Sequence, residues 1–248
     1  MSHKRYLLAL GAVFLVIWLA LAIDPVDRTT WLLENSLPVI FVVVIFFTWR
    51  HLVFSRLSYT MIFIFMCLHT FGAHYTYSLV PYDQWTEALF GVPLNEAMGW
   101  ERNHYDRLVH FCYGLLLAYP IREVFLRVAV VRGFWGYFLP LDVTMSTSMI
   151  YELIEWGAAI QFGGDTGMHF LGTQGDVWDA HRDMALASLG ALIAMAVTAA
   201  INGWLQRDFA REWVESFRVK GVDPLGEDEV VRLWRKLKSS LHTGEDDR

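Results

Sequence analysis

The sequence predicts an all-α fold, a polytopic integral membrane helical bundle of about six transmembrane helices with both termini in the cytoplasm. Two observations carry this prediction. Of the 248 residues, 55% are hydrophobic and only 19% are charged, which is hard to reconcile with a water-soluble domain. Apolar runs of about 20 residues recur along the chain, and this is the length that crosses roughly 30 Å of hydrocarbon.

Six apolar runs account for the predicted helices. The first resembles a cleavable signal sequence, because Lys4 and Arg5 precede it and Ala20-Leu21-Ala22 mimics a cleavage site. Since the rest of a polytopic chain needs no secretion signal, we expect this helix to be retained. The second run is short, and its helix is extended if it begins near Trp31. The runs cover residues 5–23, 36–49, 57–79, 106–127, 134–161 and 183–204.

Positive charge sets the orientation of such a bundle, because cytoplasmic loops carry an excess of lysine and arginine. If six helices alternate in direction, the loops on one side are basic and those on the other are mainly acidic. We therefore expect a multi-pass protein of the bacterial inner membrane. Residues 1–205 form its transmembrane domain, and residues 206–248 form an amphipathic cytoplasmic tail with apolar residues at every fourth position. The basic side carries Lys4, Arg5, Arg50, Arg56, Arg127, Arg132, Arg207 and Arg211.

Composition argues against two kinds of function. The net charge is −6, and no basic patch is interleaved with aromatic residues, so the chain is not expected to bind nucleic acid. The two cysteines, Cys67 and Cys112, both lie in apolar runs. Neither a disulfide framework nor a thiolate zinc site is therefore indicated.

Ionisable residues gather in the outer half of the predicted bundle. The third run carries His69 and His74, and the fourth opens with HYDRLVHF, in which Asp106 and His110 are four residues apart on one helical face. Charged groups inside a membrane cost several kcal/mol each by insertion scales. We therefore expect these side chains to face the bundle interior or a water-filled cavity and to have partners there.

Two further segments bring carboxylates to the same depth. The segment YELIEW places Glu152 and Glu155 in the outer third of the fifth helix. The segment LGTQGDVWDAHRDM enters the last helix, and its three aspartates, Asp176, Asp179 and Asp183, are spaced for one face. Six carboxylates then outnumber the three nearby arginines, which are Arg102, Arg107 and Arg182. Like charges in a low dielectric must stay protonated or share a cation.

Three interpretations of this polar layer remain open. The carboxylates and histidines suit a divalent cation such as zinc, manganese or magnesium. The same residue types also form proton relays in transporters. Alternatively, the acids pair with arginines and hold the helices together. On the cation hypothesis Glu152 and Glu155 act as general acid or base, and the metal ligands come from Asp106, His110, Asp176, Asp179, Asp183, His69 and His74.

The quoted segments, together with HTFGAHYTY, carry a resemblance to the uncharacterised bacterial YjdF-type inner-membrane family, and it extends from the second helix to the sixth. More distantly, the chain resembles the VanZ-like membrane proteins, which are associated with glycopeptide resistance. Their pattern has an Asp-x-x-x-His pair opening one helix, a helix end rich in glutamate and an aspartate-rich entry into a final helix. This chain departs from it by its additional N-terminal helices, by His69 and His74, and by its tail.

We expect a site that acts on an outer-leaflet lipid or a lipid-linked precursor of the cell envelope, with the metal polarising an oxygen or activating water. A proton- or ion-coupled carrier of a small solute is the second hypothesis. A structural or assembly protein without turnover is the third. The sequence contains no inverted internal repeat, which disfavours a standard transporter architecture.

Overall fold

All regular structure in the described part of the chain is helical. The computed structural model describes residues 2–163, 173–206, 208–218, 230–236 and 238, and residues 230–236 form a helical stretch. The all-α prediction is therefore confirmed over these ranges. The helices, in order, are α1 (His3–Leu21), α2 (Arg28–Thr48), α3 (Arg56–His74), α4 (Tyr82–Phe90), α5 (Leu94–Met98), α6 (Tyr105–Arg127), α7 (Trp135–Phe162), α9 (Asp179–Leu205) and α10 (Phe209–Glu215).

Five of these helices, α1, α2, α3, α6 and α9, are long and apolar enough to cross a membrane. The prediction of a polytopic helical bundle is thus confirmed, with five qualifying helices where the sequence predicted about six. Helix α7 is the remaining long helix, with 28 residues. Its sequence includes several polar residues, among them the buried Thr144, Ser148 and Glu155.

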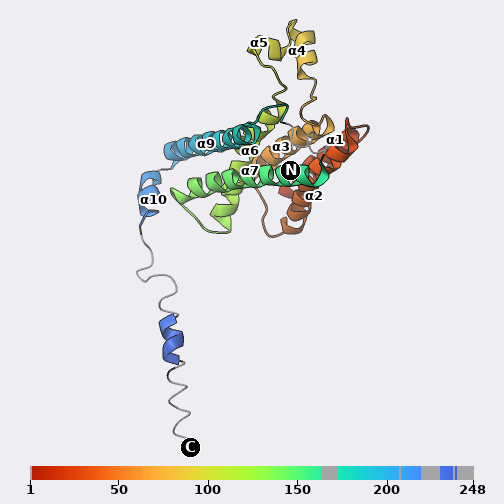
Figure 1. The fold of residues 1–248 in the computed structure, drawn as a ribbon. Helices are drawn as coiled ribbons and strands as arrows, with labels where there is room; N and C mark the ends of the chain where they lie inside the picture. Colours follow the sequence, from red (N-terminus) through yellow and green to blue (C-terminus); the bar gives the residue numbers. More distant parts are fainter. Residues whose placement is uncertain (1, 164–172, 207, 219–229, 237, 239–248) are drawn as a thin grey trace, which may run out of the picture.

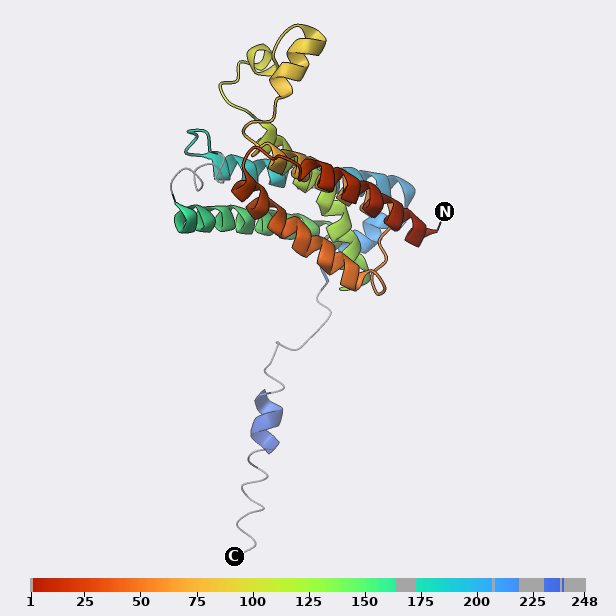
Figure 2. The same cartoon turned by 90° about the vertical axis from the view of Figure 1, so that its right-hand side faces the viewer.

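Helix α6 lies at the centre of the bundle and packs against α3, α7 and α9, while α1 and α2 pack against α3 (Figures 1 and 2). The most extensive of these interfaces joins α6 to α9. Small residues form it: Gly114 of α6 meets the backbone of Ala187 and Ala191 in α9, and both alanines are fully buried. Gly190 of α9 in turn meets the backbone of Phe111 and Leu115 in α6. Small side chains let two helix backbones approach closely, which is how helices associate in lipid.

Helix α2 begins earlier than the apolar run that predicted it. The side chain of Asp27 caps its first turn by accepting a hydrogen bond from the Thr30 amide at 2.6 Å. The earlier start places Glu34 and Asn35 inside the helix, where they are 4% and 3% exposed. Asn35 accepts a hydrogen bond from the indole of Trp18 in α1 at 2.8 Å. The two N-terminal helices are therefore joined by a buried polar contact.

Helix α3 ends earlier than predicted, at His74 rather than near residue 79. Thr76 and Tyr77 have φ values of 52° and 56°, in the left-handed region that cannot continue a right-handed helix. The chain consequently folds back, so that Tyr77 is buried against the helix that it has just left. Helices α4 and α5 follow and project away from the bundle (Figures 1 and 2).

After α9 the chain turns back onto the start of α7. The ring of Phe134 lies 5.5 Å from that of Trp213 and 4.8 Å from that of Phe217. The indole of Trp135 donates a hydrogen bond to the carbonyl oxygen of Ser216 at 2.9 Å. The first part of the predicted tail is thus attached to the bundle, whereas residues 219–229 and 239–248 lie outside the described residues.

Candidate functional site

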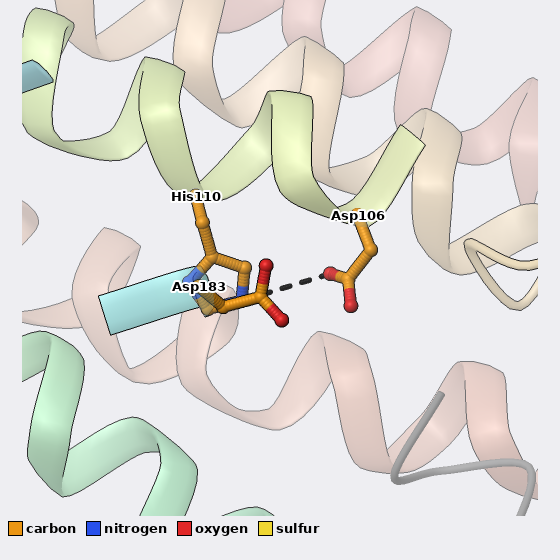
Figure 3. Close-up of side chains that lie close together, drawn as sticks. All are labelled: Asp106, His110 and Asp183. Atoms are coloured by element: carbon orange, nitrogen blue, oxygen red, sulfur yellow. Dashed lines mark ion pairs between the residues drawn. The ribbon is translucent and has the colours of Figure 1, made fainter. Parts of the chain in front are cut away.

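Three predicted ligand residues meet between α6 and α9 (Figure 3). Asp106 lies in the first turn of α6, and His110 follows one turn later on the same face. Asp183 reaches them from α9. One ligand atom from each of the three residues can be chosen so that all lie within 4.8 Å of one another, and His110 and Asp183 are buried. These residues, with Glu152 of α7, form what we call the inner cluster.

His110 lies between two carboxylates of the inner cluster. Its Nε2 atom is 3.6 Å from Oδ1 of Asp106 and also 3.6 Å from Oε1 of Glu152. Both distances exceed the 2.7–3.2 Å typical of a direct N–H···O hydrogen bond. The imidazole therefore faces two acceptors without bonding closely to either one.

Two oxygen atoms of the inner cluster have no hydrogen-bond partner within the described structure. They are Oε1 of Glu152 and Oδ1 of Asp183, and both are buried. Leaving a buried acceptor unsatisfied costs about 1–3 kcal/mol, and more when it is charged. Such atoms in a folded protein call for an explanation, and an ion is one of the ordinary explanations.

A second group of charged residues lies next to the inner cluster, at the N-terminal ends of α6 and α9. It consists of Arg102, Arg107 and Arg182 with Asp176 and Asp179, and we call it the arginine layer. Arg102 donates to Oδ1 of Asp179 at 2.5 Å, and Arg107 lies 3.3 Å from the same oxygen. Arg107 and Arg182 both donate to Oδ2 of Asp176. These contacts join the start of α9 to the segment that leads into α6.

Asp176 is held in its charged form. The Trp178 amide donates a hydrogen bond to its Oδ1 at 3.0 Å. This bond is the largest cause that lowers the pKa of the Asp176 carboxyl, and the neighbouring Arg182 and Arg107 lower it further, against the opposing effect of burial. The loop that carries Asp176 has positive φ values at Gln174 and Gly175, in the left-handed region typical of tight turns.

The two histidines of α3 lie apart from the inner cluster. Nδ1 of His69 lies 2.5 Å from the hydroxyl of Tyr77, and its Nε2 lies 3.0 Å from the carbonyl oxygen of Glu34. Nδ1 of His74 lies 2.8 Å from the carbonyl oxygen of Leu21. Both histidines that the sequence proposed as ligands are therefore engaged in contacts between helices.

Glu155, the other predicted acid or base, is 8% exposed and belongs to a polar chain that leads away from the inner cluster. It lies within hydrogen-bonding reach of Glu152 and Tyr151. The Tyr151 ring packs edge-on to His110 at 5.9 Å, and its hydroxyl donates to Oε2 of Glu34 at 2.8 Å. Side chains of α6, α7 and α2 are thereby connected.

Sequence reasoning missed Glu34 and Tyr151. The apolar run that predicts α2 begins only at residue 36, so the pattern leaves Glu34 in the preceding loop. The signal that places it in the membrane is Asp27, a residue type that favours helix N-caps, seven positions before it. Tyr151 gave no separate signal, since a tyrosine in an apolar helix is ordinarily a packing residue.

The helices and the buried polar groups define a multi-pass membrane protein. The chain belongs to the family described as "Predicted membrane protein (DUF2238)", whose model matches residues 6–203. It is 40% identical over 174 residues to "Inner membrane protein YjdF" of Escherichia coli (strain K12), covering 70% of this chain and 79% of that protein. No solved structure matches the chain.

These comparisons confirm the YjdF-type resemblance and the expected location, a multi-pass protein of the inner membrane. The more distant resemblance to VanZ-like proteins stays a prediction. Neither the family description nor the relative's name gives a reaction.

Proposed function

We propose that the inner cluster binds a divalent cation and that the protein uses it to act on an outer-leaflet lipid or a lipid-linked envelope precursor. In this proposal α7 is a sixth transmembrane helix and both termini are cytoplasmic. The ends of α3, α7 and α9 that carry the polar residues then face the outer side of the inner membrane. The ligands are Asp106, His110, Asp183 and Glu152.

The observation that carries the proposal is the pair of 3.6 Å distances from Nε2 of His110 to the two carboxylates. Two ligands at about 2.0–2.1 Å from a tetrahedral zinc ion are separated by about 3.4 Å. The spacing is therefore long for hydrogen bonds but close to that of two ligands on one ion. Small side-chain rotations bring Asp183 to the same centre, since its carboxylate is within 4.8 Å of the other two residues.

Charge supports a cation at this place. The inner cluster holds three carboxyl groups around one imidazole, and two of their oxygens lack a hydrogen-bond partner. A divalent ion supplies the missing partner and the missing positive charge together. The mixed oxygen and nitrogen set fits zinc or manganese better than magnesium, which prefers oxygen ligands and retained water.

The remaining chemical roles in the proposed reaction follow from the residues around the proposed ion. A bound divalent ion polarises a phosphoryl or carbonyl oxygen, or lowers the pKa of a water molecule. Glu155 is buried beside the ligand Glu152, in a position to hold or deliver a proton during that reaction. Asp176 and Asp179 bind arginines, and His69 and His74 bind neighbouring helices, so we leave these four residues out of the ligand set.

Metal analysis of detergent-purified full-length protein tests the cation proposal. We expect about one divalent ion per chain by mass spectrometry, and its loss in Asp183→Asn and His110→Ala variants. Asp208→Asn is the control, because that carboxylate is 64% exposed at the far end of α9. Thermal unfolding shows whether each variant is folded. If wild-type protein holds no ion after incubation with zinc, manganese and magnesium in turn, the cation proposal is contradicted.

A second candidate function, a proton- or ion-coupled carrier, is favoured by the polar chain described above. It runs from His110 past Tyr151 to Glu34, whose carbonyl oxygen contacts His69. Chains of this composition conduct protons in transporters. Proteoliposomes with a trapped pH dye separate the two functions, since a carrier acidifies the lumen under a solute gradient and needs no metal. If the protein is purely structural, neither assay responds.

A further inference from the structure

Three arginines converge on a single carboxylate oxygen in the arginine layer. Arg107 and Arg182 donate to Oδ2 of Asp176, and Nη1 of Arg102 is 3.8 Å from it. The side chains of Arg102 and Arg107 are only 11% and 12% exposed, so two of the three positive charges are largely withdrawn from water. Arginines at a largely desolvated position bind planar or tetrahedral anions strongly.

One donor of this group remains unused. The Nε atom of Arg107 is buried and has no hydrogen-bond partner in the described structure. A guanidinium that contacts an anion side-on donates from Nε and one Nη together, which is the bidentate geometry preferred for carboxylate and phosphate. Asp176 engages only the Nη2 side of this fork. The contact with Asp176 therefore leaves part of the arginine's binding capacity unfilled.

Of the two aspartates in the arginine layer, Asp176 is the one that can move away from the arginines more easily. It lies outside α9 in a loop, whereas Asp179 belongs to the first turn of the helix and is 3% exposed. Without Asp176, the three arginines and Asp179 carry a net charge of about plus two. A phosphate monoester carries about −1.5 to −2 near neutral pH, which matches that charge.

The layer lies next to the inner cluster along both helices that build it. Arg107 follows the ligand Asp106 directly in α6, and Asp179 precedes the ligand Asp183 by one turn of α9. One helical turn is about 5.4 Å. A phosphoryl group held by the arginines thus has its bridging oxygen within reach of an ion in the inner cluster. Arginine clamps and metal ions act together in this way in phosphoryl chemistry.

We propose that Arg102, Arg107 and Arg182 form the phosphate-binding subsite for the substrate and that Asp176 occupies it until substrate arrives. This inference rests on the proposed function and narrows the substrate to a lipid with a terminal phosphate. The Asp176 carboxylate stands in for the phosphate in the empty protein. Substrate binding exchanges one anion for the other, and Asp179 keeps α9 attached to Arg102 throughout.

Titration calorimetry on the full-length protein in detergent tests the subsite. The probes are dihexanoyl phosphatidic acid, dihexanoyl phosphatidylcholine and inorganic phosphate. We expect wild-type protein to bind phosphatidic acid, whose phosphate is a monoester, and not to bind phosphatidylcholine, whose phosphate is a diester. Equal affinity for inorganic phosphate would support the subsite with free phosphate as its ligand. Failure of both phosphatidic acid and inorganic phosphate to bind would overturn it.

Two variants with opposite expected effects make the test specific. Asp176→Asn removes the competing charge, and its side-chain oxygen still accepts from the Trp178 amide, so affinity should rise about tenfold or more. Arg107→Gln removes a charged donor and should lower the affinity about tenfold or more. Arg127→Gln, at the other end of α6, is the matched control and should change nothing. Weaker binding by Asp176→Asn, or unchanged binding by folded Arg107→Gln, would overturn the inference.

Metal content measured on the same samples keeps the two proposals apart. Phosphatidic acid binding in protein without any ion would support the subsite and count against the metal centre. One ion per chain with no response to either phosphate probe would support the metal centre and overturn the subsite. Binding that Arg107→Gln weakens while the ion remains in place is the outcome that we expect.

Discussion

Gly114 of α6 and Gly190 of α9 hold two helix backbones in direct contact. A Cβ atom on Gly114 would lie 1.8 Å from the carbonyl oxygen of Ala187, and a Cβ atom on Gly190 would lie 2.2 Å from that of Phe111. Both obstructing atoms are backbone, which cannot rotate away. Because Asp106, His110 and Asp183 lie on these same two helices, the contact also sets the distance between these three side chains.

Replacing either glycine by alanine is expected to force α6 and α9 apart. We expect Gly114→Ala to destabilise the protein by about 1–3 kcal/mol or more, as overpacking does in closely packed interiors. Gly157→Ala in α7 is the matched control, since no atom lies within 4 Å of the added Cβ. Thermal unfolding in detergent measures both. Equal melting temperatures for the two variants would contradict this account of the interface.

The imidazole of His110 is expected to determine which metal the inner cluster prefers. Because the other ligands are oxygen atoms, His110→Ala should weaken zinc binding by more than tenfold and magnesium binding far less. His181→Ala is the control, because His181 is exposed on the same helix as Asp183. Competition with a zinc-sensitive dye gives the affinities. An unchanged zinc affinity in folded His110→Ala would mean that His110 is not a ligand.

The contacts of Asp176 are expected to persist over the whole physiological pH range. Its pKa is lowered below the value of about 3.9 that holds in an unfolded chain. A lowered folded-state pKa contributes stability that is present above the unfolded value and is lost as pH falls through the folded value. The melting temperatures of wild type and Asp176→Asn should therefore differ by a constant amount from pH 5 to 8 and converge below about pH 4. Convergence near pH 6 would contradict the assignment.

The course of α7 across the membrane is tested by labelling. If α7 crosses the membrane, the loops before and after it lie on opposite sides. Val128 and Val177 are 65% and 85% exposed in those loops. In a variant lacking Cys67 and Cys112, an impermeant maleimide added to spheroplasts should label Val177→Cys and not Val128→Cys. Labelling of both positions from outside would mean that α7 does not cross the membrane.

Attachment of α10 is expected to depend on its aromatic side chains. Trp213 lies 5.5 Å from the ring centroids of both Phe134 and Tyr137. We expect Trp213→Ala to release α10, because aromatic pairs add about 0.5–1.5 kcal/mol each beyond the area that they bury. Trypsin should then cut at Arg211 faster in inside-out membrane vesicles. Trp204→Ala, at an 87% exposed position, should leave the cutting rate unchanged.

The sequence predicted the helices well because length and hydropathy decide which segments enter a membrane. Its errors lie at helix ends, where local backbone chemistry decides. The Asp27 side chain starts α2 early, and left-handed residues at 76 and 77 stop α3 early. Helix α7, which is not among the five helices apolar enough to cross a membrane, carries the buried Glu155 and the largely buried Glu152.

The four members of the inner cluster were predictable from the sequence, but their separation from the arginine layer was not, and neither were the contacts of His69 and His74 or the roles of Glu34 and Tyr151. Same-face spacing grouped Asp179 with Asp183 and Asp106 with His110, and spacing alone treats each pair as equivalent. The two aspartates differ in depth by one helical turn, so Asp179 meets arginines while Asp183 meets His110 and Asp106. The same applies to Asp176, whose contact with Arg107 depends on how a loop folds back in space.

Contact between the α6 and α9 backbones restricts how this protein can move. The two helices interlock through glycines, so we expect them to move as one unit. Asp106, His110 and Asp183 then travel together as a rigid unit, whereas Glu152 approaches or withdraws with α7. If the inner cluster binds an ion as proposed, a motion of α7 would change the number of its ligands between four and three, and the position that Glu152 leaves would be open to a substrate oxygen.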